Sequence, residues 1–177
     1  MRYRRANIPG GTYFFTVNLE ERDRTTLVDH VDSLRASLRE VMARRPFSID
    51  AVVILPDHLH ALWTLPVNDC DYPTRWALLK AGFSRRIPRE ERCKPSRVSK
   101  GERSIWQRRY WEHLVRDELD YGRHVDYIHF NPVKHGYVGR ASDWPYSSIH
   151  RYIAAGTLSS DWGGDVRIRG GYGFGER

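Results

Sequence analysis

The stretch VVILPDHLHALWTL, residues 52–65, constrains this chain most, because it is a largely apolar run that carries two histidines, His58 and His60. A run of this composition predicts buried strand. In a strand the side chains of residues i and i+2 leave the same face about 7 Å apart, so both imidazoles can approach one ion. A lone His-x-His is more often an ordinary part of a sheet, so a metal site requires further ligands elsewhere in the chain.

The segments around this run predict one α+β domain. We expect strands over residues 12–19, 47–55, 58–65 and 105–116. Pro56 and Asp57 mark the bend between the middle two strands. Apolar residues recur at helical spacing in two segments, which predicts amphipathic helices over residues 27–45 and 73–87. The order β-α-β-β-α-β is that of a ferredoxin-like arrangement, an antiparallel sheet with these two helices on one face.

The remaining segments are less apolar. Residues 88–104 are rich in charges of both signs, which predicts a mobile surface loop. A short helix is expected over residues 146–155, after a cap at Ser142 and Asp143. Residues 157–177 are rich in glycine and predict a flexible tail. We therefore expect one domain over residues 1–156, followed by that tail.

Composition limits the class of protein and its partners. The chain has a net charge of +7 and an isoelectric point near 9.6, which favours a polyanionic partner and above all nucleic acid. No apolar run reaches the roughly 18 to 20 residues of a membrane span, and no signal-type segment follows the first residues, so a cytoplasmic protein is expected. Cys70 and Cys93 are too few and too far apart for a cysteine metal site.

A helix that begins at Asp117 carries the second group of candidate site residues. Asp117 is expected to cap it, and Pro132 is expected to end it near residue 131. One stripe of this helix is apolar and comprises Tyr121, Val125 and Ile128. A second stripe lies roughly a quarter turn away and comprises Asp120, His124, Tyr127 and Asn131. Tyr127 and Asn131 are neighbours on this second stripe, where they offer a phenol and an amide oxygen.

Five blocks of the sequence together resemble one known family. They are YRRANIPGGTYFFTVNL, LPDHLHALWTLP, IWQRRYWEHLVRD, HVDYIHFNPVKHGYV and SDWPYSS. The chain resembles the REP-associated tyrosine transposases, a branch of the single-tyrosine HUH transposases, in which U denotes a hydrophobic residue. The resemblance implies that His58 and His60 are the HUH pair, with Leu59 between them. It also implies that Tyr127 is the nucleophile and that Asn131 is the third metal ligand.

The chemistry implied is cleavage and rejoining of single-stranded DNA. Tyr127 would attack a phosphodiester and form a 5′-phosphotyrosine, while the departing strand keeps a free 3′-OH that can reverse the step. The mixed nitrogen and oxygen donors suit Mg²⁺ or Mn²⁺. The family further implies that the substrate is a repetitive extragenic palindrome, recognised as a folded single-stranded hairpin.

The basic residues are the expected DNA contacts. The candidates for phosphate binding are Arg2, Arg4, Arg5, Arg108, Arg109 and Lys134. Tyr110 and Trp111 are candidates for base stacking. Arg167 and Arg169 of the tail are candidates to reach the DNA or the site. We expect a monomer, although a dimer that exchanges the tyrosine helix also fits the pattern.

The sequence is also compatible with two other functions. In a metal-dependent phosphohydrolase the histidines would activate water, and Tyr127 would only pack. In a non-catalytic hairpin-binding module neither the histidines nor a metal would matter, and binding would depend steeply on salt.

Overall fold

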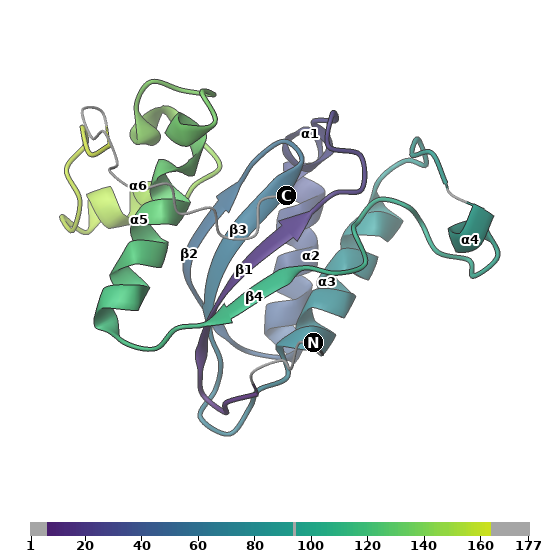
Figure 1. Cartoon of the computed structure of the whole chain (residues 1–177), viewed down its shortest axis with the longest axis horizontal. Coiled ribbons are helices and arrows are strands. Elements are labelled where there is room, and N and C mark those ends of the chain that lie inside the picture. Colours follow the sequence, from purple (N-terminus) through teal and green to yellow (C-terminus); the bar gives the residue numbers. More distant parts are fainter. Residues whose placement is uncertain (1–6, 94, 164–177) are drawn as a thin grey trace, which may run out of the picture.

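The structure is a computed structural model that describes residues 7–93 and 95–163. Its centre is a four-stranded antiparallel sheet with the strand order β2-β3-β1-β4 (Figure 1). The strands are β1 (Thr12–Asn18), β2 (Ser48–Ile54), β3 (His58–Thr64) and β4 (Trp111–Leu114). This order is that of the ferredoxin-like arrangement, so the predicted α+β fold is confirmed.

The first predicted helix is divided in two. It consists of α1 (Thr26–Asp29) and α2 (Val31–Arg44), which are separated at His30, where φ is −117° and ψ is 31°. The N–H of Leu27 donates to the carbonyl of Pro56 at 3.0 Å. This bond ties α1 to the turn between β2 and β3. The expected single helix was wrong, because the backbone leaves helical geometry at His30. The second predicted helix is α3 (Tyr72–Arg86), whose cap Asp71 accepts from the N–H of Thr74.

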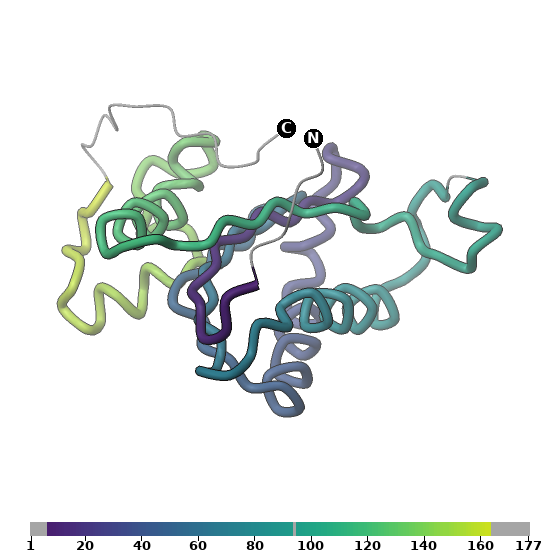
Figure 2. The backbone as a smooth tube through the Cα atoms, turned by 60° about the horizontal axis from the view of Figure 1, so that its bottom comes forward, coloured from purple at the N-terminus to yellow at the C-terminus, as the bar shows by residue number. Residues whose placement is uncertain are grey.

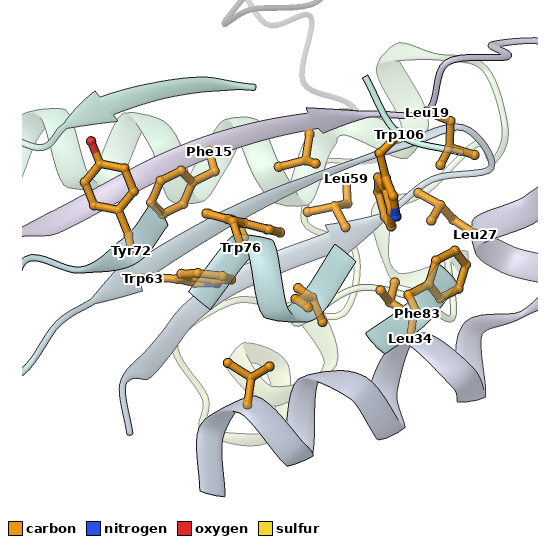
Figure 3. Packing of buried hydrophobic residues seen from close by; sticks show 14 of the residues in the cluster. Phe15, Leu19, Leu27, Leu34, Leu59, Trp63, Tyr72, Trp76, Phe83 and Trp106 are labelled. Atoms are coloured by element: carbon orange, nitrogen blue, oxygen red, sulfur yellow. The ribbon is translucent and has the colours of Figure 1, made fainter. Parts of the chain in front are cut away.

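The larger core lies between α2, α3 and one face of the sheet (Figure 3). On β3 this face carries Leu59, Ala61 and Trp63, and the indole of Trp63 stacks on that of Trp76 with ring centroids 4.1 Å apart. Alternation along a strand sends the intervening residues to the opposite face. His58 and His60 therefore point away from α2 and α3.

The opposite face of the sheet is covered by α5 (Glu118–Lys134), as Figure 2 shows in a view along the sheet. A second core forms there, in which Val125 and Ile128 pack against Phe14 and Leu62. The apolar stripe predicted for this helix therefore faces the sheet. Its expected cap is present, because Asp117 accepts from the N–H of Asp120 at 2.8 Å.

The predicted end of this helix near Asn131 was wrong, because α5 continues through Pro132 to Lys134. Proline removes its own N–H from the ladder, and its ring crowds the carbonyl four residues earlier, so it disfavours a helix without excluding one. The last turn is held by the N–H of His135, which donates to the carbonyl of Asn131 at 3.0 Å, and by that of Tyr137, which donates to Pro132 at 3.0 Å.

The segment after α5 returns to the edge of the sheet. It contains the 3₁₀ turn η1 (Ala141–Asp143) and the helix α6 (Ile149–Ala154). The helix expected from residue 146 begins later, because residues 146–148 are bonded to β2 instead. The N–H of Ile54 donates to Tyr146, and the N–H of Ser148 donates to Val52, each at 2.8 Å. The division into a domain over residues 1–156 and a tail over 157–177 stays a prediction, and residues 164–177 lie outside the described part.

The last predicted strand, over residues 105–116, is much shorter than expected. Only Trp111–Leu114 pair regularly with β1, and Trp106 meets Leu19 in an isolated bridge. Between these points the carbonyl of Gln107 accepts from Lys80 of α3 at 3.0 Å. The backbone there is bonded partly to a helix, which interrupts the ladder.

Residues 88–93 and 95–104 project beyond the sheet and α3 (Figure 1), and they hold the short helix α4 (Pro95–Val98). The predicted surface loop therefore contains one helical turn, and two arginines bond it to the rest of the domain; its mobility stays a prediction. Arg97 is buried and donates to the carbonyl of Trp106 at 2.9 Å and to Glu20 at 2.8 Å. Arg103 makes a double hydrogen bond to the Glu91 carboxylate, at 2.6 and 2.7 Å.

The Glu91–Arg103 pair gives a testable pH dependence. The hydrogen bond from Arg103 lowers the pKa of Glu91 from its ordinary 4.5 to about 2. The contribution of the ionised Glu91 carboxylate to local stability is therefore complete above about pH 4.5 and is lost as the pH falls towards 2. We expect Arg103→Met to speed amide hydrogen exchange in residues 88–104 about tenfold at pH 6. The exposed Arg89 of the same segment supplies the control Arg89→Met, and equal exchange in the two variants would contradict the assignment.

Candidate active site

The site begins with the two histidines of β3, which lie on the face covered by α5. His58 and His60 are 1% and 0% exposed, and their ring centroids are 5.1 Å apart with an angle of 86° between the ring planes. The sheet register places His58 opposite Asn18 and His60 opposite Thr16 on β1. The pair is thus fixed by the most central strands of the sheet.

Each histidine is oriented through its Nδ1 atom. For His58, Nδ1 lies 2.7 Å from Oδ1 of Asp57, and Asp57 is itself paired with Arg22. For His60, Nδ1 lies 2.9 Å from the hydroxyl of Thr16. A metal-binding histidine is commonly held in this way through its other ring nitrogen. The expected ligand atom of each ring is then Nε2.

The Nε2 atom of His58 provides a test of whether a metal fits. This atom is buried and has no hydrogen-bond partner among residues 7–93 and 95–163. A buried polar atom in that condition costs free energy unless a ligand satisfies it. Burial also lowers the pKa of His58 below its ordinary value, which favours the neutral imidazole that binds metals. The donor set of His58 therefore fits a divalent cation.

Tyr127 reaches the same place from α5. Its ring centroid lies 5.2 Å from that of His60 and 5.9 Å from that of Phe14. The ammonium of Lys134, two turns along the helix, donates to the phenol oxygen at 3.2 Å and lies 4.8 Å from the ring centroid. Asn131 is fully buried one turn beyond Tyr127. The structure thus brings Tyr127 next to the histidine pair within a single chain.

The predicted DNA contacts are distributed differently. Arg2, Arg4 and Arg5 lie outside the described residues, as do Arg167 and Arg169. Arg108 is paired with Glu102 at 3.0 Å, and Arg109 is exposed. Lys134 lies against the phenol of Tyr127. Tyr110 and Trp111 are half-buried beside Trp76 and Phe14, so they pack at the margins of the two cores.

A second cluster that could hold a metal comprises His113, Asp120 and His124, whose candidate ligand atoms all lie within 4.8 Å of one another. Sequence reasoning placed Asp120 and His124 on one stripe but missed His113, which comes from β4. The rings of His113 and His124 are stacked, with centroids 4.8 Å and planes 22° apart. Nitrogen lone pairs lie in the ring plane, so those of stacked rings run side by side and converge poorly on one ion. The nearly perpendicular rings of His58 and His60 suit a shared ion better.

The hydrogen bonds of this second cluster join β4 to α5 and have a structural role. Oδ2 of Asp120 lies 2.8 Å from Nε2 of His113 and accepts from the N–H of Arg116 at 3.0 Å. Burial opposes ionisation of Asp120, but these hydrogen bonds outweigh it and lower its pKa to about 2. A carboxylate ionised throughout the physiological range therefore fixes the first turn of the tyrosine helix.

Sequence reasoning also missed the residues that orient the pair, which are Thr16, Arg22 and Asp57. Only Asp57 carried a signal, since it directly precedes His58 in the bend between β2 and β3. Burial of Asp57 opposes its ionisation, yet the hydrogen bond from His58 and the charge of Arg22 keep the pKa of Asp57 below its ordinary value. Asp57 therefore stays ionised beside the histidine.

Replacing Asp57 by asparagine is expected to weaken Mn²⁺ binding about tenfold to a hundredfold while leaving the fold intact. The amide keeps the shape of the side chain but removes the charge that holds the His58 ring. Isothermal titration calorimetry measures the affinity, and Asp23→Asn, which changes an exposed carboxylate one residue after Arg22, is the control. Equal Mn²⁺ affinity in both variants would show that Asp57 does not orient a ligand.

None of the helices in the described part of the chain has both the length and the apolar character of a membrane span.

No protein-family model matches the sequence. Several individual proteins, however, are similar to this chain. A Haemophilus influenzae protein named as a REP-associated tyrosine transposase is 47% identical over 171 residues, which are 95% of this chain and 97% of that one. The REP-associated tyrosine transposase of Escherichia coli K12 is 46% identical over 164 residues, 93% of this chain and 92% of that one.

A solved structure agrees with these relatives. It is that of a REP-associated tyrosine transposase bound to a REP hairpin, and it matches with a TM-score of 0.85 and 44% identity over 100% of this chain and 98% of that chain. Identity at this level, spread over nearly the full length of each relative, confirms the family expected from the sequence. The chain is therefore an enzyme of the tyrosine transposase class and belongs to the REP-associated tyrosine transposases.

Proposed function

We propose that this protein cleaves and rejoins single-stranded DNA at hairpins of the repetitive extragenic palindromic type, with Tyr127 as the nucleophile. The observation that carries the proposal is the position of Tyr127. Its ring centroid lies 5.2 Å from that of His60, which in turn lies 5.1 Å from the ring centroid of His58. A phenol beside a histidine pair with one buried, unsatisfied Nε2 atom suits attack on a phosphate held by a cation.

His58, His60 and Asn131 would hold that cation. Their nitrogen and oxygen donors suit Mg²⁺ or Mn²⁺, which would neutralise charge on a non-bridging oxygen of the scissile phosphate. Asp57 and Thr16 keep the two imidazoles oriented through their hydrogen bonds to Nδ1. The fully buried Asn131 would complete the set from α5.

Tyr127 must lose its proton to react. A free phenol has a pKa of about 10, so near pH 7 only about one molecule in a thousand is ionised, a deficit of roughly 4 kcal/mol. The ammonium of Lys134, 3.2 Å from the phenol oxygen, would stabilise the phenolate. The phenolate oxygen bonds to phosphorus as the bond to the 3′ oxygen breaks, and that oxygen leaves as a 3′-OH after taking up a proton. Attack by the 3′-OH reverses each step and rejoins the strand.

The proposed partner is a DNA hairpin with unpaired nucleotides beside it. The solved relative is bound to a REP hairpin, and this chain carries a net charge of +7. Arg4, Arg5, Arg108 and Arg109 remain proposed phosphate contacts, and Lys134 is proposed to act first on the phenol.

We further propose that a monomer is the active form. Asp120 fastens the first turn of α5 to His113 of β4 at 2.8 Å. Near the other end, His129 bonds to the hydroxyl of Ser148 at 2.9 Å, and this hydroxyl accepts from the N–H of Val52 on β2 at 2.9 Å. The helix is thus attached at both ends to the sheet that carries its own histidine pair.

The proposal is tested with hairpin DNA that carries single-stranded flanks and is labelled at either end. The protein is incubated with Mn²⁺, with and without a chelator, and the products are separated on a denaturing gel. We expect the 3′-labelled fragment to migrate with the protein and the 5′-labelled fragment to be released, and both products to vanish with chelator. Cleavage to a free 5′ phosphate without an adduct would indicate a hydrolase, and binding without cleavage would indicate a binding module.

A further inference from the structure

A row of aromatic rings leads away from His58 across the surface. The ring of His135 lies 5.2 Å from that of His58, and the ring of Tyr137 lies 5.9 Å from that of His135. Trp144 follows at 5.3 Å from Tyr137, and Tyr146 at 5.7 Å from Trp144. We call His135, Tyr137, Trp144 and Tyr146 the aromatic row. It starts at the proposed metal site and ends beside β2.

The aromatic row is accessible, unlike the rings of the two cores. Tyr137 is 43% exposed and His135 is exposed, whereas Trp144 and Tyr146 are half-buried. A single exposed ring is common on protein surfaces, whereas a connected row of rings that leads from a proposed site suits a ligand that stacks on them. Burial in the cores does not explain the positions of Tyr137 and His135.

The inner part of the row is held rigidly by the backbone of β2. The indole N–H of Trp144 donates to the carbonyl of Ile54 at 2.9 Å, and the N–H of Ile54 donates to the carbonyl of Tyr146 at 2.8 Å. The first bond fixes the ring of Trp144, on which the Tyr137 ring stacks with an angle of 29° between the planes. A ring fixed in this way loses little conformational entropy when a ligand binds. Trp144 is therefore preorganised to support Tyr137 as a binding surface.

Charge at the far end of the row favours a nucleic acid over an apolar partner. The guanidinium carbon of Arg35 lies 5.9 Å from the centroid of the Tyr146 ring, and its side chain is 46% exposed. Arg35 also contacts the exposed carboxylate of Asp32 at 3.3 Å, a surface pair that a phosphate can replace. Proteins hold single strands with rings on which the bases stack and with basic side chains that contact the phosphates. In a duplex the base faces are already covered by neighbouring pairs, so only unpaired nucleotides can use such a surface.

We propose that the aromatic row binds the unpaired nucleotides that flank the scissile phosphate, with bases stacked on Tyr137. This inference rests on the proposed function, because it is the proposed metal site at His58 that places a DNA phosphate at the start of the row. The row would guide the single strand into the site, while the hairpin itself is bound elsewhere.

The test uses the variant Tyr127→Phe as background, so that binding is measured without cleavage. Fluorescence anisotropy gives the affinity for a hairpin with a 5′ flank, a 3′ flank or no flank. Adding Tyr137→Leu is expected to weaken binding of one flanked hairpin about tenfold and to leave the bare hairpin unchanged. Tyr137→Phe keeps the ring and is expected to retain full affinity. Leu119→Ala, at an exposed residue on the first turn of α5, is the surface control.

A second readout reports stacking directly. A 2-aminopurine placed in the flank is quenched when it stacks on an aromatic ring, and we expect this quenching in the background protein and its loss with Tyr137→Leu. Equal affinities of Tyr137→Leu and its background for all three DNAs would overturn the inference and leave the proposed function standing. An equal loss for the bare hairpin would also overturn it, since the row would then contact the stem. Failure to bind any hairpin would overturn both proposals.

Discussion

Replacing Tyr127 by phenylalanine is expected to abolish the covalent protein–DNA adduct and to lower strand cleavage at least about a thousandfold. The variant loses only the phenol oxygen. Its ring can keep the contacts with Phe14 and His60, so the fold and the metal site should survive. The rate of cleavage of labelled hairpin DNA in Mn²⁺ measures the effect, and circular dichroism checks the fold.

A matched control comes from the same helix. Tyr121 lies on the other stripe of α5, beside Asp50 and Tyr152, where burial raises the pKa of its phenol. Tyr121→Phe also removes one phenol oxygen from α5 but leaves the proposed site unchanged, so full cleavage is expected. If Tyr127→Phe cleaved DNA as fast as Tyr121→Phe, the nucleophile would have to be water or another residue.

Replacing His58 by glutamine is expected to weaken Mn²⁺ binding at least about a hundredfold and to reduce cleavage in proportion. The change removes one of the two imidazoles that the fold presents to the proposed cation. Removing a direct ligand should lower the Mn²⁺ affinity by more than the tenfold to hundredfold typical of a residue that only orients a ligand. Titration calorimetry with Mn²⁺ gives the affinity.

The second cluster supplies the comparison for this experiment. His113→Gln removes an imidazole from the group formed with Asp120 and His124. The hydrogen bonds of this group join β4 to α5. We expect this variant to bind Mn²⁺ normally and to lose some thermal stability. The opposite result, with binding lost in His113→Gln and kept in His58→Gln, would move the metal site to that cluster.

The fold was predictable from the sequence where periodicity decides it. Alternation along residues 58–65 sends Leu59 and Trp63 to one core and leaves the two histidines on the other face, as the structure shows. The errors lie where contacts distant in sequence override local preference. The first turn, α1, is bonded to Pro56 through Leu27 and is separated from α2 at His30, and Lys80 bonds to Gln107 where the last strand is interrupted.

The candidate site was predictable only in part, for a related reason. Spacing placed His58 and His60 on one strand face, and the family resemblance connected them with Tyr127 on another element. Spacing did not reveal that Arg22 pairs with Asp57 behind His58, or that Lys134 reaches back to the phenol. A basic residue looks the same in the sequence whether it binds a phosphate or a phenol, and only the path of the helix distinguishes the two.

The most direct test of the account is to locate the DNA on the protein. A hairpin substrate that cannot religate is incubated with the protein and Mn²⁺, the complex is digested with a protease and nuclease, and the nucleotide-bearing peptide is sequenced by mass spectrometry. The account predicts a nucleotide joined through its 5′ phosphate to Tyr127. A nucleotide attached to any other residue, or cleaved DNA with free 5′ phosphates and no modified peptide, would contradict it.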